Sequence, residues 1–187
     1  LGNDFRLDGD YAGRHFVYGL CESAREEVRK AHDVANPGCF ATAIQLATLP
    51  LAAAGLINDE IHVTAITGST GAGKKPGETT HFSYRGDNIS IYKLFTHQHL
   101  AEIRQNLRKV SEDKLEAKVN FVPLRGDFTR GIFASVYTRA EEGMSQQDYQ
   151  KLYEDYYASS PFVFHSAEGI SMKEVINTNK GLVHVEQ

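Results

Sequence analysis

The spacing of polar and apolar positions predicts a chain in which strands outnumber helices. Residues 61–67 alternate between polar and β-branched or apolar side chains, which is typical of a strand with one buried face. Similar or shorter patterns predict further strands at 80–84, 89–93, 118–124, 131–139, 162–164 and 181–185. The first 20 residues are rich in glycine and aromatic residues, and we expect them to be irregular.

Helical patterns occupy four segments, at residues 22–31, 39–47, 97–110 and 145–157. Pro50 is expected to kink or end the second helix because proline lacks the N–H that the helix needs. The helices and strands do not alternate regularly along the chain. We therefore expect the α+β class, a mixed β-sheet packed with helices, in one domain that spans residues 1–187.

Composition and charge exclude some classes of protein. Hydrophobic residues make up 41% of the chain, the net charge is −4 and the isoelectric point is near 6.1. A general nucleic-acid binder would carry a basic balance, so no nucleic acid is expected as a partner. No apolar run approaches the roughly 18 residues that span a bilayer, and we see no signal peptide, so we expect no membrane partner and a cytoplasmic location. Cys21 and Cys39 are expected to be reduced thiols.

Cys39 has the surroundings of a reactive thiol. It follows Asn36-Pro37-Gly38 and opens the second predicted helix. Unpaired N–H groups and the helix dipole favour an anion there, so we expect the pKa of this thiol to be lowered. The alternative is a small buried apolar residue, which is a common place for a cysteine. Cys21 lacks this setting.

His97, His99 and Glu102 lie at the start of the third predicted helix. In a helix, His99 and Glu102 share one face at i, i+3. An imidazole oriented by a carboxylate can act as a general acid or base near neutral pH. Zinc ligation at these offsets is a weak signal, and a solvated helix start is the other alternative.

The segment Gly68–Lys74 resembles the phosphate-binding loop of nucleotide-binding proteins. A predicted strand precedes it, but Lys75 stands where serine or threonine would bind magnesium, and Pro76-Gly77 interrupts the helix that should follow. A flexible loop whose backbone N–H groups approach a phosphate or a cofactor fits better. Arg85, Arg125 and Arg130 are candidates for binding an anion, although a surface ion pair is the commoner role of an arginine.

Several segments together resemble the N-acetyl-gamma-glutamyl-phosphate reductase family of arginine biosynthesis, which is related to the aspartate-semialdehyde dehydrogenases. They are Asp4-Phe5-Arg6-Leu7, Val17-Tyr18-Gly19-Leu20, Ala35 to Ala43, Thr67 to Lys74, Thr96-His97-Gln98-His99 with Glu102-Ile103, and Arg130-Gly131-Ile132. The Asn-Pro-Gly-Cys and His-x-His-x-x-Glu segments are the most specific. The resemblance spans roughly residues 3–135 and implies the fold of the C-terminal catalytic domain of semialdehyde dehydrogenases.

The resemblance implies an NADP-dependent oxidoreductase that converts an N-acyl-glutamyl phosphate to the semialdehyde through a cysteine thioester. Carried over by motif, Cys39 is the nucleophile. His97 and His99 supply the acid–base group and substrate contacts, and we favour His99 because Glu102 can orient it.

The same resemblance implies binding residues and partners. Thr70 and Gly71 match a loop that touches the nicotinamide end of the cofactor in related dehydrogenases, and Arg130 would hold an anionic part of the substrate. The partners expected are a small acyl phosphate and further copies of the chain, in a dimer or tetramer. No metal is expected.

Some family features are missing from this sequence. No Gly-rich dinucleotide-binding fingerprint follows an N-terminal strand, so we expect residues 1–187 to be the catalytic and dimerisation domain, with the Rossmann cofactor domain mostly absent and the isolated fragment inactive. Cys21-Glu22 replaces the usual Pro-Glu, and no histidine follows Phe121-Val122-Pro123. The alternatives are a nucleotide-binding module built on Gly68–Lys74 and a non-catalytic oligomerisation domain.

Overall fold

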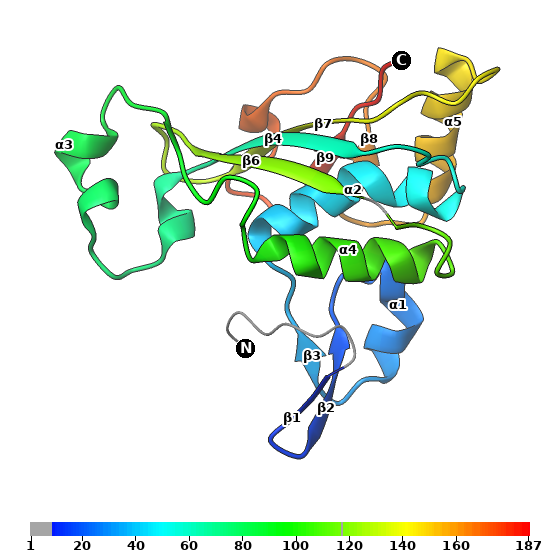
Figure 1. Ribbon diagram of the computed structural model, residues 1–187, viewed down its shortest axis with the longest axis horizontal. Helices are drawn as coiled ribbons and strands as arrows, with labels where there is room; N and C mark the ends of the chain where they lie inside the picture. The colour runs from blue at the N-terminus through cyan, green and yellow to red at the C-terminus, as the bar shows by residue number, and fades with distance from the viewer. Residues whose placement is uncertain (1–8, 117) are drawn as a thin grey trace.

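A mixed four-stranded sheet forms the centre of the fold (Figure 1). The computed structural model describes residues 9–116 and 118–187, so the segment Asp4 to Leu7 lies outside the described residues. The strand order is β5-β6-β4-β7, and the strands are β4 Ile61–Thr67, β5 Ser90–Ile91, β6 Val119–Arg125 and β7 Ile132–Tyr137. The pair β4 and β6 is parallel, whereas β7 and β5 run antiparallel to their neighbours. The expected α+β class with a mixed sheet is confirmed.

Two helices, α2 (Cys39–Ala53) and α4 (His99–Val110), cover one face of this sheet (Figure 1). The alternation along β4 decides which side chains they meet, because successive residues of a strand point to opposite faces. Ile61, Val63 and Ala65 are buried against the helices with Phe121 of β6. This core fixes the position of the first turn of α2 relative to the first turn of α4.

The opposite face of the sheet carries half-exposed and exposed side chains. We call this surface the open face. Its residues are His62, Thr64, Ile66, Asn120, Val122, Leu124, Phe133, Ser135 and Tyr137. The rings of His62 and Tyr137 stack at 5.2 Å across neighbouring strands.

Pro50 lies inside α2, so the expectation that it ends the apolar helix is wrong, while the alternative of a kink stays a prediction. A proline at position 50 cannot donate to the carbonyl of Leu46, which is four residues earlier. Tyr157 Oη of helix α5 (Gln146–Tyr157) donates to that carbonyl over 2.5 Å, and Tyr153 Oη donates to the carbonyl of Ala47 over 2.5 Å. Because α5 supplies these hydrogen bonds, the helix continues to Ala53.

The N-terminal part of the described chain is ordered, contrary to the expectation of an irregular segment. Strands β1 (Gly9–Tyr11) and β2 (Arg14–Tyr18) form a hairpin, and its turn residues Ala12 and Gly13 have φ of 52° and 75°. Helix α1 (Cys21–Lys30) follows, and β3 (Val34–Ala35) then pairs parallel with β2. Strand β3 ends four residues before α2, so this pairing fixes where α2 begins.

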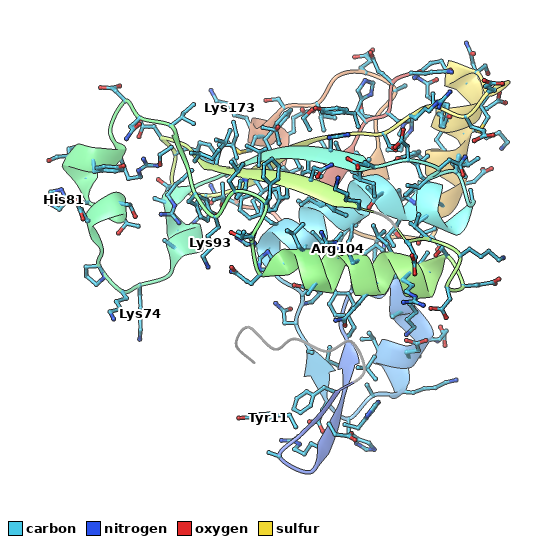
Figure 2. The ribbon with its side chains drawn as sticks, in the orientation of Figure 1. Tyr11, Lys74, His81, Lys93, Arg104 and Lys173 are labelled. Atoms are coloured by element: carbon cyan, nitrogen blue, oxygen red, sulfur yellow. The ribbon has the colours of Figure 1, made fainter. Side chains whose placement is uncertain are left out.

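An excursion connects β4 to α4 and extends away from the sheet (Figure 1). It contains 3-10 turns at Ser69–Ala72 and Glu78–Thr80 and the short helix α3 (Phe82–Arg85), so the strand expected at 80–84 is wrong. Strand β5 is shorter than the predicted 89–93. Lys74 and His81 project outward from the excursion (Figure 2).

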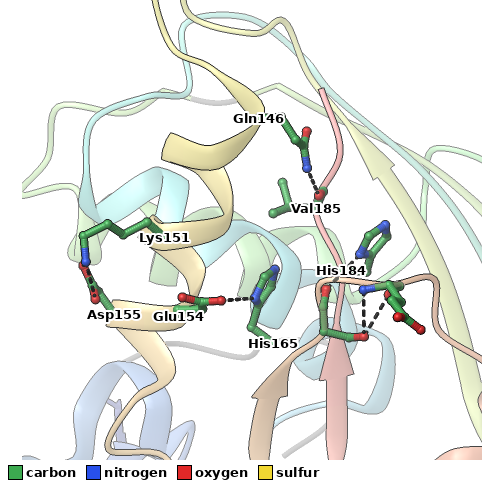
Figure 3. A network of polar contacts seen from close by, with 9 residues as sticks. Gln146, Lys151, Glu154, Asp155, His165, His184 and Val185 are labelled. Atoms are coloured by element: carbon green, nitrogen blue, oxygen red, sulfur yellow. Dashed lines mark hydrogen bonds and ion pairs between the residues drawn. The ribbon is translucent and has the colours of Figure 1, made fainter.

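Strands β8 (Val163–His165) and β9 (Gly181–Val183) form a separate parallel pair beside α2 and α5. Figure 3 shows how α5 is tied to them: Gln146 Nε2 donates to the carbonyl of Val185 over 2.7 Å, and Glu154 lies 3.7 Å from His165 Nδ1. The connection between the two strands carries the 3-10 turn Met172–Glu174. Among the described residues, no helix is long and apolar enough to cross a membrane.

Candidate active site

Cys39 is the first residue of α2, and Gly38 is its N-cap. The chain enters from β3 through Asn36-Pro37, and the extended backbone of Gly38 lets the helix begin at once. The first N–H groups of a helix have no partner within the helix. At this position the N–H groups of Cys39 and Phe40 interact with the Cys39 thiol.

The expectation that the pKa of the Cys39 thiol is lowered is wrong. Partial burial raises the pKa of this thiol, and the nearby charge of Glu102 adds to the rise, although the N–H groups of Phe40 and Cys39 act in the opposite direction. A thiolate loses more solvation than a thiol when neighbouring atoms displace water, and here that loss is the largest effect. Cys39 remains accessible to solvent, so the resting group is a reachable but protonated thiol that needs a base.

His99 lies directly against the N-cap of α2. A methyl group placed on Gly38 would be 2.4 Å from His99 Nε2, so only glycine lets the ring come this close. The ring packs edge-on against Phe40, with ring centres 6.5 Å apart. Burial lowers the pKa of His99, with opposing contributions from Glu102 and Lys93, so the imidazole is neutral at pH 7. A neutral imidazole within reach of a thiol can accept its proton, and this ring adjoins the residue just before Cys39.

His97 is a buried residue at the start of α4. Only 4% of it is exposed, and burial lowers its pKa to about 4, so it is neutral at pH 7. Its Nδ1 accepts a hydrogen bond from the backbone N–H of His99 over 3.2 Å, and its ring packs edge-on against Phe40, Tyr92 and Phe121. The alternative of a solvated helix start therefore fails for this histidine. Its position supports a structural role at the base of the site.

Glu102 does not orient His99 as expected. Its Oε1 accepts hydrogen bonds from Tyr18 Oη and from the backbone N–H of Gly38, each over 2.8 Å. Within the described residues, His99 Nδ1 is buried and has no hydrogen-bond partner. Glu102 therefore acts on the turn before Cys39, and its charge reaches His99 through space.

The predicted cofactor loop is joined to the loop that carries Arg130. The N–H groups of Gly68 and Thr70 donate to the carbonyls of Gly131 and Thr129, and Thr70 Oγ1 also donates to Thr129 over 2.8 Å. A 3-10 turn and exposed chain follow Gly68, so the arrangement lacks the helix N-terminus of a phosphate-binding loop. Gly71 packs on Thr67, since a methyl group on it would lie 2.9 Å from Thr67 Oγ1.

A cavity of about 420 Å³ opens beside the thiol. Cys39 and Arg130 both line it, which places the proposed nucleophile and the proposed anion-binding residue in one space. Residues that sequence reasoning missed complete the lining from the connection between β8 and β9, namely Ser171, Met172, Asn177, Thr178 and Lys180. These residues come from a segment without a recognisable motif, and only the fold brings them to Cys39. Among the described residues, no group of three or more His, Cys, Asp or Glu side chains could hold a metal ion.

Comparisons with known proteins identify the family of the chain. The family model described as "Semialdehyde dehydrogenase, dimerisation domain" matches residues 39–187. The chain is 49% identical over 185 residues to N-acetyl-gamma-glutamyl-phosphate reductase of Flavobacterium johnsoniae, covering 98% of this chain and 56% of the relative. It is 51% identical over 187 residues to the protein of the same name from Azobacteroides pseudotrichonymphae, covering 100% and 56%. The chain thus spans little more than half the length of these relatives.

A solved structure shows the same fold. Aspartate semialdehyde dehydrogenase II from Vibrio cholerae superposes with a TM-score of 0.64 and covers 90% of this chain and 57% of that chain. The sequence identity is 17%, so the likeness concerns the fold alone.

Proposed function

Because the chain belongs to the semialdehyde dehydrogenase dimerisation-domain family and is homologous to N-acetyl-gamma-glutamyl-phosphate reductases, we propose that it is the catalytic domain of such a reductase. The observation that carries the proposal is the accessible thiol of Cys39, which shares a cavity with Arg130 and adjoins the peptide against which His99 packs. The substrate would be an N-acyl-glutamyl phosphate, and the product its semialdehyde.

The residues of the site suit acyl transfer. His99 takes the proton of the Cys39 thiol, and the sulfur attacks the acyl carbon while the carbon–oxygen bond to phosphate breaks. The N–H groups at the start of α2 face the charge that develops, and Arg130 holds the substrate carboxylate in the cavity. Reduction of the resulting thioester releases the aldehyde and returns the sulfur as a thiol. His99 returns the proton in that step.

NADPH would supply the hydride for this reduction when bound. Thr70 and Gly71 are the described residues that we assign to its nicotinamide end, because their turn is hydrogen-bonded to the Arg130 loop beside the cavity. The turn is exposed and made of small residues, which fits a planar ring that must approach the backbone. We assign the rest of the cofactor site to the part of the relatives that this chain does not span.

An assay of the full-length protein tests this function. We expect it to oxidise NADPH only when an N-acyl-glutamyl phosphate is supplied, and to reduce NADP when the semialdehyde and phosphate are supplied together. Loss of NADPH absorbance measures the first direction. A correctly folded full-length protein that shows neither reaction would rule out the proposed function.

We also propose that the open face of the sheet is the surface through which two copies of the chain associate. The matched family model describes a dimerisation domain, and this face exposes Phe133 and Tyr137, which lie on the same side of β7 with Ser135 between them. Exposed apolar patches on a sheet commonly mark subunit contacts.

A charge on the open face is expected to separate the copies. Tyr137→Glu should raise the dissociation constant by about thirtyfold or more, the effect of losing a central aromatic contact. Tyr11→Glu is a matched control, because Tyr11 is 63% exposed, Tyr137 is 61% exposed, and Tyr11 lies on the β1–β2 hairpin away from this face (Figure 2). Sedimentation velocity measures both variants. Equal behaviour of the two would place the contact elsewhere.

A further inference from the structure

A chain of buried hydrogen bonds connects α4 and α2 to the turn that begins the active site. Asn106 Nδ2 donates to Gln45 Oε1 over 2.6 Å, and Gln45 Nε2 donates to Tyr18 Oη over 2.7 Å. Tyr18 Oη donates to Glu102 Oε1, which also accepts the backbone N–H of Gly38. Four side chains from three elements therefore end on the peptide nitrogen just before the nucleophile.

Groups beside these four side chains fix the direction of each hydrogen bond in the series. The second amide hydrogen of Gln45 goes to the carbonyl of Ala41 over 3.0 Å, and the second one of Asn106 goes to Ser23 Oγ over 3.1 Å. If the Gln45 amide were flipped, its NH₂ group would point at the NH₂ group of Asn106, and two donors would meet. The tyrosine hydroxyl already accepts from Gln45, so its own proton is directed at the carboxylate.

The side chains of this hydrogen-bond network are buried, so losing one of its hydrogen bonds leaves a polar group without solvent. Tyr18, Gln45, Glu102 and Asn106 are each at most 4% exposed. Within the described part of the chain, no ion pair joins Glu102 to a cation, so the two hydrogen bonds are what compensate its loss of solvent. A buried polar network whose members are all satisfied is rigid, and each bond in it polarises the next.

We propose that Tyr18, Gln45 and Asn106 are positioning residues that hold the Glu102 carboxylate on the Gly38 N–H and so fix the Gly38–Cys39 turn against which His99 packs. This inference rests on the proposed role of Cys39 as the nucleophile. None of the three is among the residues that line the cavity, and their hydrogen bonds reach the peptide before Cys39 through Glu102.

The rate of alkylation of Cys39 by iodoacetamide, measured against pH, tests the proposal. Peptide mass spectrometry follows Cys39 in this chain, and the exposed Cys21 reports in the same sample as an internal reference. Tyr18→Phe removes only the hydroxyl that disperses the carboxylate charge. We expect the Cys39 profile to move to higher pH and the rate at pH 7.5 to fall about threefold or more. Asn106→Leu should act in the same direction but less strongly.

Glu102→Gln is expected to shift the pH profile of Cys39 alkylation in the opposite direction. The amide keeps an oxygen for both donors but removes the negative charge that opposes ionisation of the thiol. The Cys39 profile should therefore move to lower pH. Glu102→Ala removes the hydrogen bonds as well, so its effect should differ from that of the conservative variant. Identical profiles for these two variants would contradict a positioning role.

Thr48→Val is the matched control for buried polar groups. Thr48 is 2% exposed on α2, and among the residues that the structure describes its hydroxyl donates only to the carbonyls of Ile44 and Gln45 in its own helix. It should lower the melting temperature without moving the Cys39 profile. The proposal is overturned if Thr48→Val shifts the profile as much as Tyr18→Phe does. It is also overturned if folded Tyr18→Phe or Asn106→Leu leaves the profile unchanged; two variants on different elements keep the test decisive if one does not fold.

Failure of the network and failure of the proposed function give different results. Alkylation requires neither substrate nor cofactor, so its outcome stands whatever the reductase assay shows. An inactive Cys39→Ser enzyme combined with an unmoved Tyr18→Phe profile would overturn the network alone. A fully active Cys39→Ser enzyme would overturn the proposed function.

Discussion

Replacing Cys39 with serine is expected to lower the reductase activity of the full-length protein by at least about 10⁴-fold, the scale seen when an enzyme loses its nucleophile. A hydroxyl ionises far less readily than a thiol, and the site already disfavours the ionised form, because burial raises the pKa of the group at this position. Serine would also form an oxygen ester, which accepts hydride less readily than a thioester. The measurement is the rate of NADPH oxidation with the acyl phosphate.

Cys21→Ser is the control for this substitution. Both thiols are accessible, but Cys21 lies at the start of α1, outside the cavity that contains Cys39 and Arg130. The control should keep its activity within about twofold, as is usual for a surface change away from the site. Comparable losses in the two variants would show that general damage, and not the chemistry of one sulfur, explains the result.

Adding a single methyl group at Gly38 is expected to reduce kcat about a hundredfold, since misplacing a catalytic group by about 1 Å has an effect of this size. The new methyl of Gly38→Ala would stand 2.4 Å from His99 Nε2, and because the ring is packed against Phe40 and His97, it must be displaced from its present position. The backbone of Gly38 has φ −68° and ψ 151°, which alanine adopts without strain. The fold should therefore survive.

Gly77→Ala separates this steric effect from the general cost of a glycine substitution. A methyl group on Gly77 would have its nearest neighbour at 3.7 Å, an ordinary contact. Steady-state kinetics and thermal melting of the two full-length variants should show a loss of kcat at Gly38 alone, with similar melting temperatures. A Gly38→Ala enzyme with wild-type kcat would mean that His99 is not the acid–base group.

Local patterns in the sequence predicted the central elements well. The alternation of residues 61–67 matches β4, in which every second side chain is buried, and the Pro-Gly turn before Cys39 matches the N-cap of α2. The helix expected at 145–157 is α5, and Ser145 caps it, because its hydroxyl accepts the N–H of Asp148. These features depend on neighbours within a few residues, which is why a sequence reveals them.

Features that depend on distant contacts were predicted less well. The lowered pKa of Cys39 was inferred from the helix start alone, whereas burial of the thiol, with a smaller contribution from the charge of Glu102, raises its pKa. Residues 80–84 alternate like a strand, but Phe82 is 87% exposed and the segment folds as short helical turns. The residues between β8 and β9 reach the cavity only through the tertiary fold.

The proline within α2 links parts of the sequence that are otherwise far apart. A residue with an N–H at position 50 would donate to the Leu46 carbonyl and leave the hydroxyl of Tyr157 without this hydrogen bond. Phenylalanine at position 157 would instead leave the Leu46 carbonyl without a donor. Neither substitution is neutral alone, yet with both together the Leu46 carbonyl again has a donor and no hydroxyl lacks a partner. Positions 50 and 157 should therefore change as a pair during evolution, so that Pro50 and the tyrosine that docks α5 on α2 are kept or lost together.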